Sequence, residues 1–149
     1  MDDSSAALAD ADVAALLRIQ RAAYQVEAGL IGDERIPALH ETEVDLRAAA
    51  LWWIVDRDSS GSIRGAIAFH VEDDEVDIHR LVVDPTSHRL GIGRRLVRDA
   101  MTHGSRIVVS TGLLNGPARN LYEGLAFTHV GDREVIPGLW VSDYRWERP

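Results

Sequence analysis

The sequence contains no cysteine and no lysine among its 149 residues. The missing cysteine excludes disulfides, thiolate metal sites and a cysteine nucleophile. The missing lysine excludes Schiff-base chemistry on a lysine side chain. No stretch approaches the ~20 apolar residues that span a bilayer. The opening MDDSS places acids where a signal peptide carries basic residues, so we expect a cytoplasmic protein without a membrane partner.

Positive charge is scarce, and the chain carries a net charge of -8 at pH 7. Proteins that bind the phosphates of nucleic acids present a basic face, so we expect no nucleic-acid partner. Hydrophobic residues make up 46% of the chain, and neither repeats nor low-complexity tracts are visible. We therefore expect one globular domain over residues 1–149, large enough to bury its own core.

Hydrophobic periodicity and turn residues indicate the order of elements. Helices are predicted over 11–27, 41–50, 92–103 and 115–124, and strands over 50–56, 64–71, 76–84, 106–110, 127–131 and 139–146. The first three strands follow one another through tight turns and should be antiparallel. The fold class is therefore α+β, with a mixed, mostly antiparallel central sheet flanked by helices.

The last predicted strand carries Trp140, Tyr144 and Trp146 on one face by period two, which favours a core face over a ligand platform. We expect this strand to be exposed, where it would form either the edge of a homodimer or a capped edge. The sequence leaves both alternatives open.

A glycine turn lies between the strand 76–84 and the helix 92–103. Gly91 and Gly93 remove side chains next to exposed amides, and Arg89, Arg94, Arg95 and Arg98 surround them with positive charge. A Walker motif is absent because no Gly-Lys-Ser/Thr occurs, and Leu96 stands where the dinucleotide fingerprint needs its third glycine. The turn taken alone predicts either a diphosphate site or a purely structural bend.

Three neighbouring segments together resemble the GNAT superfamily of N-acetyltransferases, which move acetyl from acetyl-CoA to amines. The stretch IHRLVVDP is similar to the fourth strand of that family, HRLGIG to its pyrophosphate loop, and NGPARNLYEGLAF to the segment beside the thioester. The likeness covers about residues 50–149. It implies a GNAT-like acyl-CoA N-acyltransferase fold.

The resemblance implies a place for acetyl-CoA. The strands 76–84 and 106–110 would splay apart, and the pantetheine arm would lie between them. The residues implied to bind the cofactor are Leu81, Val82, Val83, His88, Arg89, Leu90, Gly91, Ile92, Gly93, Arg94, Asn115 and Asn120. His88 departs from the usual glutamine or arginine, and Ala126 replaces a glycine, which is unfavourable only if that position has positive φ.

The chemistry implied by the family needs an acid for the thiolate and a base for the amine. Tyr122 occupies the place of the family's tyrosine near the sulfur and is the predicted acid. If residue 71 pairs with 76, then His70, Glu72, Asp77 and His79 share one polar face. Asp77 and His79 are therefore the base candidates, and solvated sheet residues are the alternative.

Acidic residues near the first helices indicate the acceptor. Tyr24, Glu27 and Glu41, with Glu43, lie in elements that line the acceptor side in the resembling family, and their charge would favour a small cationic amine. No spacing of ligands predicts a metal site. The leading hypothesis is an acetyl-CoA-dependent N-acetyltransferase acting by direct transfer. The alternatives are a non-catalytic CoA-binding sensor or interaction module, and a structural domain.

Overall fold

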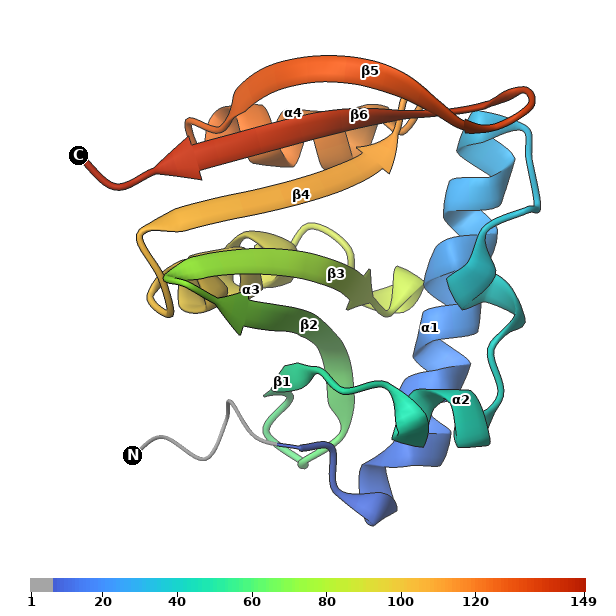
Figure 1. Ribbon diagram of the computed structural model, residues 1–149. Helices are drawn as coiled ribbons and strands as arrows, with labels where there is room; N and C mark the ends of the chain where they lie inside the picture. Colours follow the sequence, from blue (N-terminus) through green and yellow to red (C-terminus); the bar gives the residue numbers. More distant parts are fainter. Residues whose placement is uncertain (1–6) are drawn as a thin grey trace.

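Six strands pair into one sheet in the computed structural model, which describes residues 7–149 (Figure 1). Their order across the sheet is β1-β2-β3-β4-β6-β5. The strands are β1 (Trp52–Arg57), β2 (Ile63–Glu72), β3 (Glu75–Val83), β4 (Arg106–Gly112), β5 (Thr128–Ile136) and β6 (Leu139–Glu147). Neighbours are antiparallel except β3 and β4, which run parallel. This confirms the predicted mixed, mostly antiparallel sheet.

Helices cover both faces of this sheet. Within residues 7–149 they are α1 (Asp10–Ile31), α2 (Glu43–Ala48), α3 (Ile92–Met101) and α4 (Gly116–Gly124), with 3-10 turns η1 (Pro37–His40) and η2 (Pro85–Ser87). Ile67 and Phe69 of β2 share a core with α3 and α4, whereas Ala66 and Ala68 share one with α1 and α2. Alternate side chains of a strand point to opposite faces, so β2 is apolar on both faces from Gly65 to Phe69.

The opening segment on which the targeting argument depended, residues 1–6, lies outside the described residues. Among the helices of residues 7–149, none combines the length and apolar character needed to cross a bilayer. The cytoplasmic location stays a prediction.

Two elements run further than the sequence predicts. The helix α1 continues to Ile31 and ends at Gly32, whose φ of 69° forms the left-handed cap. The strand β5 extends to Ile136 because it pairs with β6 through the turn at Gly138. The expectation that the last strand is the exposed edge is wrong: β6 lies between β4 and β5, so β5 is the edge. Consistent with an inner strand, Tyr144 is buried, while Trp140 near its start is exposed.

A β-bulge interrupts β3 at His79. The turn pairs Val71 with Val76 and His70 with Asp77, as predicted, but Ala68 then pairs with Arg80. His79 is the extra residue, and the faces switch beyond it. Arg80 therefore lies on the face of the sheet next to α1, the same face as its partner Ala68, and alternation along the strand does not predict this position.

The parallel strands β3 and β4 separate beyond the bulge. They pair only from Glu75–Ile78 with Arg106–Val109, although β3 continues to Val83 and β4 to Gly112. The predicted splay is therefore present. In Figure 1 the two ribbons diverge toward α1, which stands across the open end.

Candidate active site

The turn before α3 leaves the first amides of that helix without an intrahelical acceptor. Gly91 is the N-cap, has a φ of 73° and offers no side chain to cap them. The first helical hydrogen bond runs from the Arg95 amide to the Gly91 carbonyl, 3.1 Å. The N–H groups of Ile92, Gly93 and Arg94 therefore point out of the helix end, where the helix dipole favours an anion. By contrast α4 is capped, since the Asn115 side chain accepts a hydrogen bond from the Ala118 amide.

This turn forms one end of a groove of about 390 Å³ between α1 and α4. Leu81 and Val83 form its floor, and Val26 and Leu30 of α1 form one wall. Val26 and Leu30 are 45% and 44% exposed, which is unusual for apolar side chains that share one groove. A ligand with an apolar arm and an anionic end would cover them and reach the amides of the turn. We call this cavity the cofactor groove.

Most of the residues predicted to bind the cofactor line this groove. They are Leu81, Val83, His88, Arg89, Gly91, Ile92, Gly93, Arg94 and Asn115. The Val82 side chain does not, because strand alternation buries it in the core with α1 and α2, so the contact that the resemblance implies for Val82 would come from its backbone. Leu90 and Asn120 do not line it either, and both are exposed to solvent. A Cβ at Gly93 would lie at ordinary contact distance from α4, 3.6 Å from Leu121 Cδ2.

A smaller cavity of about 90 Å³ opens between the splayed ends of β3 and β4, and we call it the junction cavity. Tyr122 lines it and is 3% exposed. Its ring packs against Phe127 and Tyr144, with centroids 5.4 and 5.9 Å away. Burial, followed by electrostatic interactions with Tyr24 and Glu27, raises the pKa of Tyr122 above its ordinary value. The phenol therefore stays protonated and can donate a proton inside the cavity.

A third cavity, of about 300 Å³, lies on the side of α1 and η1, and we call it the acceptor cavity. Tyr24 and Glu27 line both this cavity and the junction, and Glu27 also lines the cofactor groove. The Glu27 carboxylate accepts hydrogen bonds from Asn115 Nδ2 at 2.9 Å and Thr111 Oγ1 at 3.4 Å. Burial raises the pKa of Tyr24, and Glu27 adds to the effect. Glu27 thus holds a fixed carboxylate where all three cavities meet.

The two base candidates lie in different places. His79 lines the junction and acceptor cavities, whereas Asp77 lies at a separate surface depression beside Arg133 and Asp143. Asp77 Oδ2 is 3.3 Å from His79 Nε2. The structure therefore brings His79 to the cavities, with Asp77 behind it.

Glu41 lies behind the acceptor cavity rather than on its wall. Its Oε2 accepts a hydrogen bond from Arg80 Nη2 at 2.7 Å, and its Oε1 accepts one from Gln20 Nε2 at 2.7 Å. Glu43 is exposed in the first turn of α2. Arg80 itself lines the junction and acceptor cavities, and the sequence argument did not include it. No local signal marks it, since the bulge at His79 decides which way it faces.

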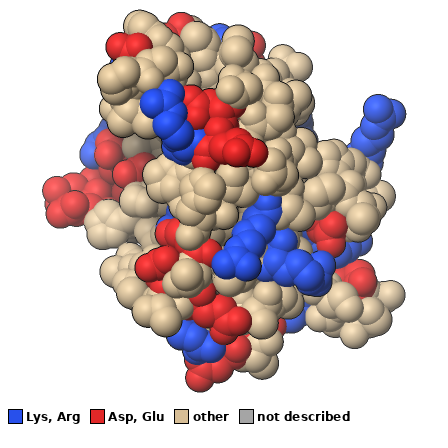
Figure 2. Space-filling view, turned by 90° about the vertical axis from the view of Figure 1, so that its right-hand side faces the viewer, with Lys and Arg blue, Asp and Glu red and all other residues tan. Residues whose placement is uncertain are grey.

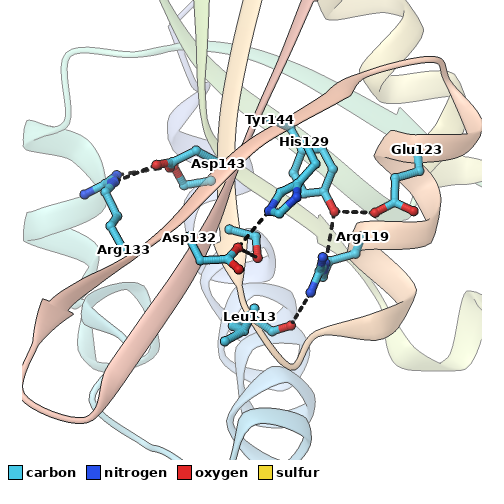
Figure 3. A network of polar contacts seen from close by, with 10 residues as sticks. Leu113, Arg119, Glu123, His129, Asp132, Arg133, Asp143 and Tyr144 are labelled. Atoms are coloured by element: carbon cyan, nitrogen blue, oxygen red, sulfur yellow. Dashed lines mark hydrogen bonds and ion pairs between the residues drawn. The ribbon is translucent and has the colours of Figure 1, made fainter.

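A polar network holds α4 against β6 (Figure 3). Arg119 Nε donates to the Tyr144 hydroxyl at 3.0 Å, and that hydroxyl donates to Glu123. Arg119 also donates to the Leu113 carbonyl at 3.0 Å. Because Tyr144 packs on Tyr122, these bonds fix the helix that carries the candidate acid.

Figure 2 shows acidic and basic side chains interspersed over one face, with arginines gathered near its middle.

Within residues 7–149, no group of three or more histidine or carboxylate side chains is placed to hold a metal ion.

The model of the Acetyltransferase (GNAT) family matches residues 13–127, which contain the splayed strands, the glycine turn and Tyr122. The chain belongs to the GNAT acetyltransferase family. Its fold agrees with this: PaiA N-acetyltransferase of Thermoplasma acidophilum, solved with coenzyme A, superposes with a TM-score of 0.73 at 11% identity, covering 95% of this chain and 97% of that one.

Two curated relatives are similar in sequence to this GNAT chain. UPF0157 protein YqkA of Bacillus subtilis is 33% identical over 130 residues, which cover 85% of this chain and 38% of YqkA. N-acetylaspartate synthetase of Rattus norvegicus is 33% identical over 120 residues, which cover 70% of this chain and 40% of the synthetase. The chain thus spans about two-fifths of the length of these relatives.

Proposed function

We propose that this GNAT domain transfers an acetyl group from acetyl-CoA to a primary amine by direct transfer in a ternary complex. The meeting of three cavities at Glu27 supports this most strongly. An amine in the acceptor cavity would reach a thioester in the junction cavity without a covalent enzyme intermediate. Holding two reactants in this way supplies a large part of the rate enhancement.

Backbone groups would provide most of the cofactor binding. The amides of Ile92, Gly93 and Arg94 would hold a diphosphate, and the uncapped end of α3 fits that role. Val26 and Leu30 would pack against an apolar arm. When bound, acetyl-CoA supplies an acetyl thioester, whose carbonyl carbon is attacked by the amine.

Tyr122 and His79 would move the two protons. As the new carbon–nitrogen bond forms and the carbon–sulfur bond breaks, His79 accepts the amine proton, and Tyr122 gives a proton to the thiolate. Asp77, 3.3 Å from His79 Nε2, would stabilise the charged imidazole. Glu27 would attract the ammonium form of the acceptor into the cavity.

A thiol-release assay with acetyl-CoA and an amine panel tests this function. The panel includes aspartate, because the similar synthetase is named for N-acetylaspartate. It also includes aliphatic diamines, because the sequence predicts a small cationic amine. Tyr122→Phe should lower kcat by roughly a hundredfold or more and leave coenzyme A affinity unchanged. Tyr144→Phe removes a neighbouring phenol that lines none of the three cavities, but whose hydroxyl holds α4 against β6. It therefore measures how much activity is lost when only the support of α4 is weakened, and Tyr122→Phe should lower kcat well beyond that loss.

Coenzyme A binding without thiol release from any amine would contradict the enzyme proposal. It would favour the alternative of a CoA-binding sensor or interaction module. Titration calorimetry with coenzyme A separates both from a purely structural domain, which would show no binding.

A further inference from the structure

We propose that the acceptor is a free α-amino acid, whose carboxylate binds Arg80 while its amine lies beside Glu27. The proposal rests on the acetyl transfer proposed above and names the class of acceptor. It assigns Arg80 a role in specificity.

Arg80 reaches the acceptor cavity because of the bulge at His79. The extra residue turns Arg80 to the side of α1, where it lines the junction and acceptor cavities. Its side chain is only 14% exposed. A cation held at the wall of a small cavity, largely out of water, interacts strongly with an anion that enters.

Interactions behind Arg80 hold it in place but leave donors free. Only Nη2 is bonded to Glu41, and Nε is buried with no hydrogen-bond partner among residues 7–149. Glu41 already accepts at both oxygens, from Arg80 and from Gln20. Gln20 is fully buried and also donates to the Ala38 carbonyl at 2.9 Å. A guanidinium has five donors in a planar fork that matches a carboxylate, so Arg80 keeps the capacity to bind one.

The cavity carries both signs of charge. Glu27 contributes a carboxylate, and Arg80 contributes a guanidinium. An amine with only positive charge would be attracted by Glu27 and repelled by Arg80. An amino acid places its ammonium and carboxylate a few bonds apart and satisfies both side chains. An amino acid thus has the ammonium group of the small cationic amine that the sequence predicts, and it carries a carboxylate as well.

The size and remaining walls of the cavity favour a single small molecule. Its volume of about 300 Å³ is at the lower end of the range for small-molecule sites. Ile36, Pro37, Val135 and Leu139 form apolar walls, against which an amino-acid side chain would pack.

The test compares L-leucine with L-leucinamide in the thiol-release assay, since the amide keeps the amine and side chain but lacks the carboxylate. The rate constant kcat/KM is expressed per unprotonated amine, and it should be about tenfold to a hundredfold higher for leucine than for leucinamide. This is the difference expected because leucinamide lacks the charge-assisted hydrogen bond between the carboxylate and Arg80. The double variant Arg80→Met with Glu41→Gln should reduce this ratio to near one. The double change avoids leaving Glu41 buried and unpaired, which would itself destabilise the fold.

Arg64→Met is the matched control, because Arg64 pairs with Asp56 at 2.9 Å and lines none of the three cavities. It should preserve the preference for leucine. Equal kcat/KM for leucine and leucinamide, or a preference that survives loss of Arg80, would overturn the amino-acid assignment and leave acetyl transfer intact. If no amine of any kind gives thiol release, this would contradict acetyl transfer itself, and the assignment with it.

Discussion

Replacing Ala126 by glycine should stabilise this protein, although glycine usually weakens a fold. Ala126 follows the end of α4 and has a φ of 68°. The Ala126 amide donates to the Glu123 carbonyl and the Phe127 amide to the Tyr122 carbonyl, which is the Schellman pattern of helix termination. That pattern places its left-handed residue at position 126, where the resembling family has glycine. Alanine there is strained.

The magnitude follows from two opposing effects. A left-handed conformation costs a residue with a Cβ about 1–2 kcal/mol. Glycine loses more chain entropy on folding, which offsets roughly 0.5–1 kcal/mol of that gain. Ala126 is exposed, so no packing is lost. The free energy of unfolding should therefore rise by about 1 kcal/mol, and the melting temperature by roughly 2–4 °C for a domain of this size.

Urea unfolding and thermal unfolding of Ala126→Gly measure this change. Ala22→Gly is the matched control: it makes the same substitution at an exposed position inside α1 and should lower the free energy of unfolding by about 1 kcal/mol. If both variants lose stability to a similar extent, the left-handed strain at Ala126 is refuted.

Three further predictions concern the cofactor turn and pH. Gly91→Ala places a Cβ at a φ of 73°, which should lower the free energy of unfolding by about 1 kcal/mol in urea unfolding. The same change should weaken coenzyme A binding in titration calorimetry. The hydrogen bonds from Ser142 and His129 lower the pKa of Asp132 below its ordinary 3.8. The ionised Asp132 therefore stabilises the fold above pH 3.8, and this stabilisation is lost as pH falls through the lowered pKa. Midpoints of urea unfolding measured at acid pH would show the loss. Burial raises the pKa of all three tyrosines above the ordinary 10.0, so the folded protein should show less phenolate absorbance at that pH than the unfolded chain. The contribution of the buried phenols to stability should decline as pH rises further, and equal phenolate absorbance of the folded and unfolded protein at about pH 10 would contradict this burial.

Much of the fold was predictable because its signals are local. The apolar stretch of β2, the alternation at the start of β3, the tight turn between them and the glycines before α3 each depend on neighbours a few residues away. The segments around Gly91 and Tyr122 were sufficient to suggest the family, and the structure places both on one groove and its junction cavity.

Other features of the molecule depend on partners that are distant in the sequence. Asn120 and Leu90 belong to segments near the cofactor groove and are exposed, and their binding of the cofactor stays a prediction. The predicted edge strand β6 is an inner strand, since β5 pairs with its far side. Whether a strand lies inside a sheet is decided by pairing energies between separate segments, which periodicity within one segment does not record.

The sequence by itself determined the elements, the glycine turn and the residue types that can carry acetyl transfer. Only the tertiary structure decided which charges meet in the cavities. Glu27 comes from α1, His79 and Arg80 from a bulged strand, and Tyr122 from α4, and they converge because β3 and β4 separate. The physical reason is that one extra residue in a strand reverses which face later side chains occupy, and its place is fixed by pairing with β2 rather than by its own sequence.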